Sequence, residues 1–194
     1  MTARAQHILD TLIGLDPLSS LHRTGWALRG VASPESIADH SHGVALCTML
    51  IVDALRAEGQ SVDGEKALRM AIVHDAPEAA TGDVPMPVKT PELDAALAAV
   101  ESTLVDRLLP SGVAADWREM EAGESLEARI VKAADKLQMM AKADIYGSQG
   151  RGQLEDFWAN EMNFRNRGLA VVEEVFSLLR ERHRERSRAP RAGH

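Results

Sequence analysis

Two histidines and two aspartates in this sequence form a possible ligand set for one divalent metal ion. His74 and Asp75 are adjacent, His40 precedes them, and Asp135 follows. Imidazole nitrogen and carboxylate oxygen suit borderline and hard divalent ions, and a site with two of each leaves coordination positions for water and substrate. A desolvated carboxylate beside a histidine also needs a cationic partner. The four side chains therefore predict a metal site with open positions for chemistry.

Each of these ligands has an ordinary structural explanation when it is taken alone. His40 fits a hydrogen-bonded core histidine, and Asp135 fits an ion pair with Lys132 or Lys136. The segment PEAATGDVPMPVK after Asp75 favours the interpretation as a metal site. An apolar helical stretch is followed there by acids, prolines and a glycine. The shared site is therefore our first hypothesis.

Three blocks of the sequence resemble the signatures of the HD-domain metal-dependent phosphohydrolases, and within them the small 5′-deoxynucleotidases. The blocks are HRTGWALRGVASPESIADHSHGVA (22–45), IVHDAPEAATGDVPMPVK (72–89) and AADKLQMM (133–140). They occur in the family's order, and the resemblance covers about residues 5–180. It implies that the ion is a catalytic metal.

The resemblance also implies roles for residues outside the ligand set. Glu78 would orient or deprotonate the attacking water, and Asp83 would assist the leaving 5′-oxygen. Arg23 would bind the phosphate through its planar guanidinium, and the flat indole of Trp26 would exclude a 2′-hydroxyl. Lys89 is a candidate for further positive charge near the phosphate. The alternatives are a solvated helix end for Glu78, a turn for Asp83, packing under a loop for Trp26 and plain solvation for Lys89.

Helical patterns predict the elements that position these side chains. We expect helices at roughly 3–14, 36–59, 63–77, 92–109, 124–146, 153–162 and 169–184, with only a short stretch around 115–120. Ser36 and Asp63 are expected N-caps, and Pro77 is expected to end the helix that carries His74 and Asp75. The fold prediction is an all-α, single HD-domain helical bundle over residues 1–186, with metal ligands on three helices. Residues 187–194 are an expected disordered tail.

Composition excludes several functional classes. The net charge of −7 disfavours a nucleic-acid polymer as partner, since counterion release needs clustered Lys and Arg. No stretch reaches the roughly 20 apolar residues that span a bilayer, so no membrane partner is expected. The N-terminus has no secretory signal pattern, and the single cysteine, Cys47, fits a reducing compartment. We therefore expect a cytoplasmic protein.

The preferred functional hypothesis is a metal-dependent phosphohydrolase that releases phosphate from (deoxy)nucleoside 5′-monophosphates with one divalent ion, Mn, Co, Fe or Zn. The nearest alternative is a nucleotide or nucleotide-analogue triphosphohydrolase, which would differ in the group that leaves. An HD-type oxygenase is disfavoured because no histidine lies between Asp75 and Asp135 to hold a second metal. A non-catalytic nucleotide-binding protein is disfavoured because Glu78 and Asp83 are present. The resemblance further implies a homodimer.

Overall fold

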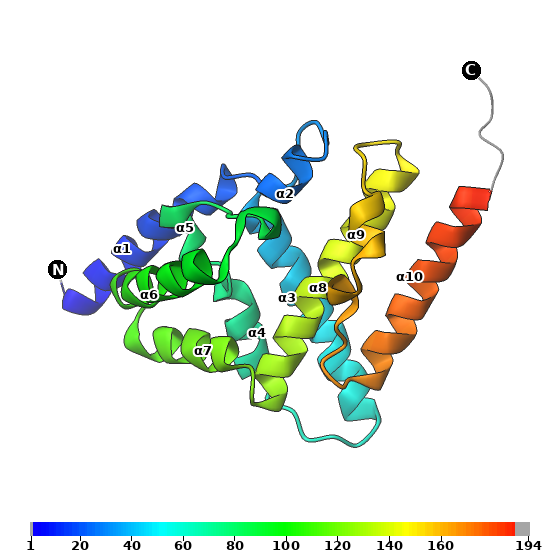
Figure 1. Ribbon diagram of the computed structural model, residues 1–194. Helices are drawn as coiled ribbons and strands as arrows, with labels where there is room; N and C mark the ends of the chain where they lie inside the picture. The colour runs from blue at the N-terminus through cyan, green and yellow to red at the C-terminus, as the bar shows by residue number, and fades with distance from the viewer. Residues whose placement is uncertain (1, 189–194) are drawn as a thin grey trace.

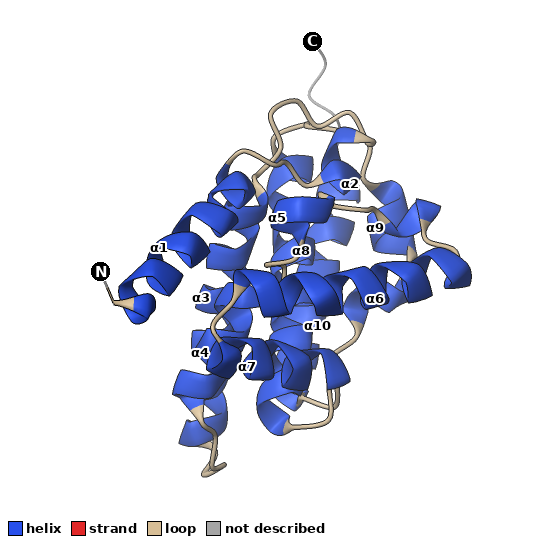
Figure 2. Ribbon diagram, turned by 90° about the vertical axis from the view of Figure 1, so that its left-hand side faces the viewer, coloured by secondary structure: helices blue, strands red, loops and turns tan. Residues whose placement is uncertain are grey.

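A computed structural model of the protein describes residues 2–188, which fold into a bundle of helices without a β-strand (Figures 1 and 2). The all-α prediction is therefore confirmed. Within the described range, no helix is long and apolar enough to cross a membrane. The elements in chain order are α1 (Ala3–Leu15), η1 (Asp16–Ser19), α2 (Thr24–Ala27), α3 (Ile37–Ala57), α4 (Gly64–Val73), α5 (Glu78–Thr81), η2 (Met86–Val88), α6 (Pro91–Leu108), α7 (Ser111–Ala122), α8 (Leu126–Ser148), α9 (Glu155–Ala159), η3 (Glu161–Phe164) and α10 (Ala170–Arg188).

Helices α3 and α8 form the centre of the bundle (Figure 1). Helix α4 packs against both, α7 contacts α4 and α8, and α10 covers another side of α8. Burial of each large apolar side chain contributes roughly 1.5–3 kcal/mol, so this core holds α3 and α8 firmly against each other. Its fully buried members include Ile37, Val44, Leu55, Met70, Ile130, Val131, Met140 and Phe176.

Side-chain caps fix the starts of α3 and α4, as the sequence predicted. The Oγ of Ser36 accepts a hydrogen bond from the backbone N–H of Asp39, and the Asp39 carboxylate accepts one from the N–H of Ser36, both at 3.0 Å. Asp63 accepts a hydrogen bond from the N–H of Lys66 at 3.0 Å. Such caps stabilise a helix by about 1 kcal/mol. They set the register that carries His40 at the end of the first turn of α3.

The prediction that His74 and Asp75 lie inside a helix ending at Pro77 was wrong. Helix α4 ends at Val73, His74 is its C-cap, and Asp75 lies in the turn that follows. Pro77 has no N–H to continue the helical hydrogen bonds, and its ring would clash with the carbonyl four residues earlier, that of Val73. That carbonyl instead accepts a hydrogen bond from Ala76. A tight turn, not helical periodicity, therefore sets the direction of these two ligands.

Two further boundaries differ from the expected ones. The stretch around 115–120 belongs to the full helix α7, whose Ala114, Trp117 and Met120 are buried at helical spacing. Helix α10 continues to Arg188, so the first two residues of the expected tail, Ser187 and Arg188, are helical. The rest of that expectation lies outside the described residues.

Candidate metal centre and catalytic site

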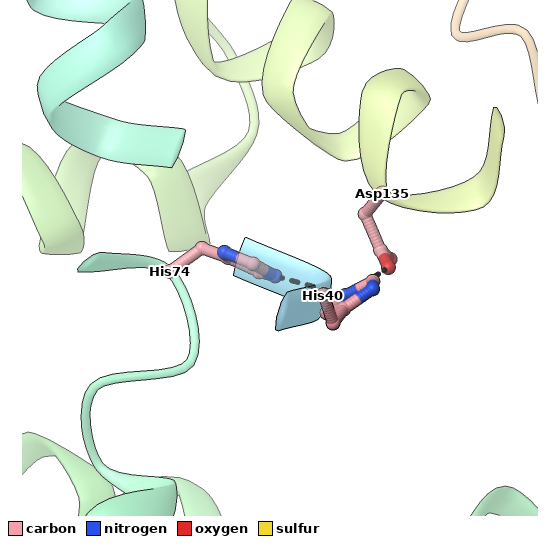
Figure 3. A group of neighbouring side chains, drawn as sticks. All are labelled: His40, His74 and Asp135. Atoms are coloured by element: carbon pink, nitrogen blue, oxygen red, sulfur yellow. Dashed lines mark hydrogen bonds and ion pairs between the residues drawn. The ribbon is translucent and has the colours of Figure 1, made fainter. Parts of the chain in front are cut away.

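His40, His74 and Asp135 converge on one point between α3, the end of α4 and α8 (Figure 3). One ligand atom from each residue lies within 4.8 Å of the other two. The Nε2 atom of His40 is 3.3 Å from Nε2 of His74 and 3.3 Å from Oδ1 of Asp135. The side chains of the two histidines are almost fully buried. The structure thus brings together three residues that are widely separated in the sequence.

The hydrogen bonds of the two imidazoles show that the cluster suits a cation. Nδ1 of His40 lies 2.6 Å from Oε1 of Gln138, and Nδ1 of His74 lies 2.8 Å from the carbonyl oxygen of Ala71. Each of these oxygens can only accept, so each Nδ1 carries a proton, and a ring in its neutral form has its lone pair on Nε2. Two such lone pairs at 3.3 Å repel each other unless a proton or a metal cation lies between them. The donor set therefore fits a divalent ion.

Asp75 lies beside this cluster, outside the group of three. Its Oδ2 is 3.1 Å from Nε2 of His74, 3.6 Å from Nε2 of His40 and 3.1 Å from a guanidinium nitrogen of Arg23. Burial alone would raise the pKa of Asp75, but His74 and Arg23 hold that pKa below its usual value. Burial would likewise raise the pKa of Asp135, but Lys136 and the contact with His40 hold it well below its usual value. Both carboxylates are therefore ionised at neutral pH.

A cavity of about 370 Å³ opens beside the cluster. Its wall contains every predicted site residue except His74, which contacts the wall residue His40. The wall thus brings together the predicted ligands His40, Asp75 and Asp135, the predicted catalytic acids Glu78 and Asp83, and the predicted substrate-binding residues Arg23, Trp26 and Lys89.

Arg23 is surrounded by acids from the second sequence block. One guanidinium nitrogen lies 3.1 Å from Asp75, 3.5 Å from Asp83 and 3.8 Å from Glu78. Burial alone would lower the pKa of Arg23, but Asp75, Asp83 and Glu78 raise it above its usual value. Asp83 also accepts a hydrogen bond from the backbone N–H of Thr24, which joins the loop after α5 to the start of α2. The guanidinium is therefore a permanently charged, fixed donor in the cavity wall.

Glu78 is the acid of the cavity with the fewest partners. Its Oε2 is buried, lies 3.8 Å from Arg23 and makes no hydrogen bond with the described residues. Asp75 and Asp83, by contrast, both accept hydrogen bonds from Arg23. Burial and the charge of Asp75 raise the pKa of Glu78 to about 9. A divalent cation nearby would favour the carboxylate and lower this pKa. Glu78 is therefore the group best placed to exchange a proton with a water molecule in the cavity.

Trp26 contributes to the protein core as well as to the cavity wall. Its side chain is 2% exposed, and its indole stacks on Phe157 with 4.5 Å between ring centroids. Tyr146 meets the indole edge-on, and Nε1 donates a hydrogen bond to Glu35 at 2.9 Å. The packing alternative is thus part of its role, and only its cavity-facing edge is available to a substrate.

Two lysines bring positive charge to the cavity wall. Lys136, one of the two expected ion-pair partners of Asp135, lines the cavity with its Nζ 3.4 Å from Asp135. A long, flexible side chain can bend back over a neighbouring residue, so helical direction alone does not place its charge. Lys89 also lines the cavity, and its Nζ lies 4.0 Å from Asp94.

Sequence reasoning missed Glu35, which lines the cavity, and Gln138, which contacts His40. Gln138 follows Asp135 by three residues and so shares its face of α8, a spacing that could have indicated its position. Glu35 is buried just before α3. No short pattern in the sequence indicates that these two side chains meet.

A helical bundle with histidine and aspartate ligands beside an arginine-lined cavity is the architecture of a metal-dependent phosphohydrolase. The chain belongs to the HD domain family, whose pattern matches residues 15–182. Homologues in the same family carry the name 5′-deoxynucleotidase.

Three similar proteins illustrate this relationship. The 5′-deoxynucleotidase HDDC2 of Danio rerio is 30% identical over 183 residues, which cover 91% of this chain and 86% of that protein. The PH0347 protein of Pyrococcus horikoshii OT3 has a similar crystal structure, with a TM-score of 0.77, 34% identity, and coverage of 91% of this chain and 98% of that one. The cyanophage S-2L HD phosphohydrolase DatZ, bound to dA and one catalytic Zn²⁺ ion, has a TM-score of 0.61 at 24% identity, with 92% and 96% coverage. The likeness to DatZ shows the fold alone.

Proposed function

We propose that this protein hydrolyses deoxynucleoside 5′-monophosphates, using one divalent ion held by His40, His74, Asp75 and Asp135. The observation that carries the proposal is the pair of facing imidazole nitrogens, which need a cation between them and lie beside a cavity containing Arg23. The names of the vertebrate and yeast relatives, 5′-deoxynucleotidases, support this substrate class. Mn, Co, Fe and Zn all suit a mixed nitrogen and oxygen site.

In the proposed reaction, four residues of the cavity wall have separate roles. The bound ion would polarise a phosphoryl oxygen and lower the pKa of water. Arg23 binds the phosphate, because its planar guanidinium is held in place by Asp75 and Asp83. Glu78 accepts a proton from the water that attacks phosphorus, and Asp83 assists proton delivery to the 5′-oxygen as the P–O bond breaks. Lys89 adds positive charge for the phosphate.

The size and lining of the cavity favour a monophosphate. About 370 Å³ lies at the small end of the roughly 300–1,000 Å³ typical of ligand pockets. A nucleoside with one phosphate fits this space better than a nucleoside triphosphate, which is longer and carries more charge. The edge of Trp26 beside Arg23 provides an apolar surface for the sugar. We assign to this edge the exclusion of a 2′-hydroxyl.

We also propose a cytoplasmic homodimer. Helix α1 has no buried residue, and four of its large apolar side chains are 48–67% exposed. Contiguous exposed apolar side chains favour contact with another protein surface, and a second copy is the partner expected for this family. The single cysteine suits a reducing compartment. Light scattering during size-exclusion chromatography tests the assembly, and a monomer at all concentrations would refute it. The exposed large apolar residues of α1 are Ile8, Leu9, Leu12 and Ile13.

A phosphate-release screen tests the function directly. Metal-stripped protein would receive Mn²⁺, Co²⁺, Fe²⁺ or Zn²⁺ in turn, with ribo- and deoxynucleoside mono- and triphosphates as substrates. We expect inorganic phosphate from the deoxynucleoside monophosphates, and none from the His40→Ala variant. His42→Ala is a matched control, because His42 lies on the same helix but is exposed. Release of triphosphate would favour the triphosphohydrolase alternative, and inactivity with every ion would overturn the proposal.

A further inference from the structure

A chain of buried hydrogen bonds runs from Glu35 through Gln138 to His40. Oε2 of Glu35 accepts a hydrogen bond from Nε2 of Gln138 at 3.1 Å, and Oε1 of Gln138 lies 2.6 Å from Nδ1 of His40. All three residues are buried, with relative exposures of 6%, 8% and 1%. The far end of the chain, Nε2 of His40, faces the metal cluster.

The carboxylate of Glu35 determines which way the amide of Gln138 points. A buried carboxylate can only accept hydrogen bonds, so the amide must present its NH₂ group to Glu35. The amide oxygen then faces His40, and this oxygen in turn requires a proton on Nδ1. The lone pair of the imidazole is consequently on Nε2. Reversal of the amide would set an oxygen against the carboxylate and would favour the opposite tautomer of His40.

The surroundings hold the carboxylate of Glu35 and the amide of Gln138 in place. Lys142 lies 3.2 Å from Oε2 of Glu35, and Trp26 donates to Oε1 at 2.9 Å. A β-carbon added at Gly43 of α3 would lie 2.8 Å from the Gln138 side chain, so a glycine at this position leaves room for the amide. The chain is therefore a packed and fully paired network, which has a single low-energy arrangement.

We propose that Glu35 is a positioning residue that fixes the tautomer of His40 through Gln138. Its effect is to keep Nε2 of His40 unprotonated and aimed at the cluster before any ion arrives. This inference rests on the proposed metal site. It adds Glu35 to that site as the residue that fixes the tautomer of the ligand His40. Hydrogen-bonding partners behind a metal-binding histidine typically change metal affinity by about 10- to 100-fold.

The isosteric variant Glu35→Gln tests this role. Lys142 would compete for the oxygen of the new amide, so every variant is made in Lys142→Met, which also serves as the reference protein. In this background the new amide must present its oxygen to Trp26, so its NH₂ group faces Gln138. Gln138 then turns to offer its oxygen to residue 35, and its own NH₂ group meets Nδ1 of His40. We expect His40 to move its proton to Nε2 in the metal-free protein, as read by imidazole ¹⁵N NMR with the His40 signal assigned by its absence in His40→Gln. Co²⁺ affinity, measured by absorption titration, should fall about 10- to 100-fold.

A compensating exchange separates this role from general damage. In the double variant Glu35→Gln with Gln138→Glu, the carboxylate at 138 accepts from both residue 35 and Nδ1 of His40. We expect it to recover the Nδ1–H tautomer and most of the Co²⁺ affinity. Asp144→Asn is the matched control, since Asp144 is also a buried, ion-paired acid but contacts Arg182 and Arg186. It should leave the tautomer and affinity unchanged.

Three results would overturn the inference. The first is a Glu35→Gln variant with the wild-type tautomer and Co²⁺ affinity. The second is a folded double variant that recovers neither property. The third is an equal loss of affinity in Asp144→Asn. A wild-type protein that binds no divalent ion would instead refute the proposed function, while the NMR measurement on metal-free protein would still decide whether Glu35 sets the tautomer.

Discussion

Replacement of Glu78 by Gln should remove catalysis and spare the metal. A positioned general acid or base typically contributes about 10²- to 10⁴-fold to a rate. We place the contribution of Glu78 in the upper half of this range. Asp75 and Asp83 are ion-paired with Arg23, so neither carboxylate is free to replace Glu78 as the proton acceptor. We therefore expect a fall in kcat of about 10³- to 10⁴-fold, or roughly 4–5 kcal/mol in activation free energy at about 1.4 kcal/mol per tenfold.

The same substitution should not weaken the fold. Burial raises the pKa of Glu78, so the folded protein disfavours the charged carboxylate. The neutral Gln side chain carries no such charge. Gln has nearly the same volume, so the melting temperature should change by less than about 3 °C. Phosphate release from dAMP gives kcat, and mass spectrometry of the metal content checks loading. Glu101→Gln is the control, because burial also raises the pKa of Glu101 although it lies outside the cavity wall. Unchanged kcat, or loss of the ion, would refute the assignment.

Three other outcomes follow from the site and its surroundings. Asp75→Ala should abolish metal binding and turnover together, since it removes a ligand and a partner of Arg23; a variant with full metal content and activity would contradict the ligand set. Arg23→Ala should lower kcat/KM for dAMP and AMP alike, whereas Trp26→Phe should raise kcat/KM for AMP relative to that for dAMP. An unchanged ratio would make Trp26 a packing residue only. Phe is used because loss of the whole ring would cost about 3–5 kcal/mol of stability. Burial raises the pKa of Cys47 from 9.0 to about 11, so its alkylation at pH 8 should be about 100-fold slower than that of an unshifted thiol and should rise about tenfold per pH unit; a rate that levels off near pH 9 would disagree.

Sequence reasoning predicted the helices and the members of the site better than their surroundings. Ser36 and Asp63 were predictable caps because their hydrogen bonds are local, within three residues of each. The end of α4 was misplaced because the effect of Pro77 acts four residues upstream, on Val73. Contacts between side chains that are distant in the sequence could not be predicted.

The contacts of Glu35 illustrate this limit. Its partners, Trp26 and Gln138, come from α2 and α8, and no local pattern pairs residues 103 positions apart. The shared location of the acids in the second sequence block was easier to predict, because they needed only to lie near each other in a short segment. Chemistry that is concentrated in one segment is therefore visible in the sequence, whereas the support behind it depends on the packing of helices.

The three clustered ligands come from α3, the end of α4 and α8, which are far apart along the chain. An ion shared by them would act as a removable cross-link that closes two long loops, in the way a disulfide does in oxidised proteins. Such a link stabilises only the folded chain, by about 2.7 kcal/mol when the free ion exceeds its dissociation constant 100-fold. The supply of the metal ion would then determine the lifetime of the protein as well as its catalytic rate. When the ion is scarce, the inactive metal-free enzyme would be more exposed to proteolysis.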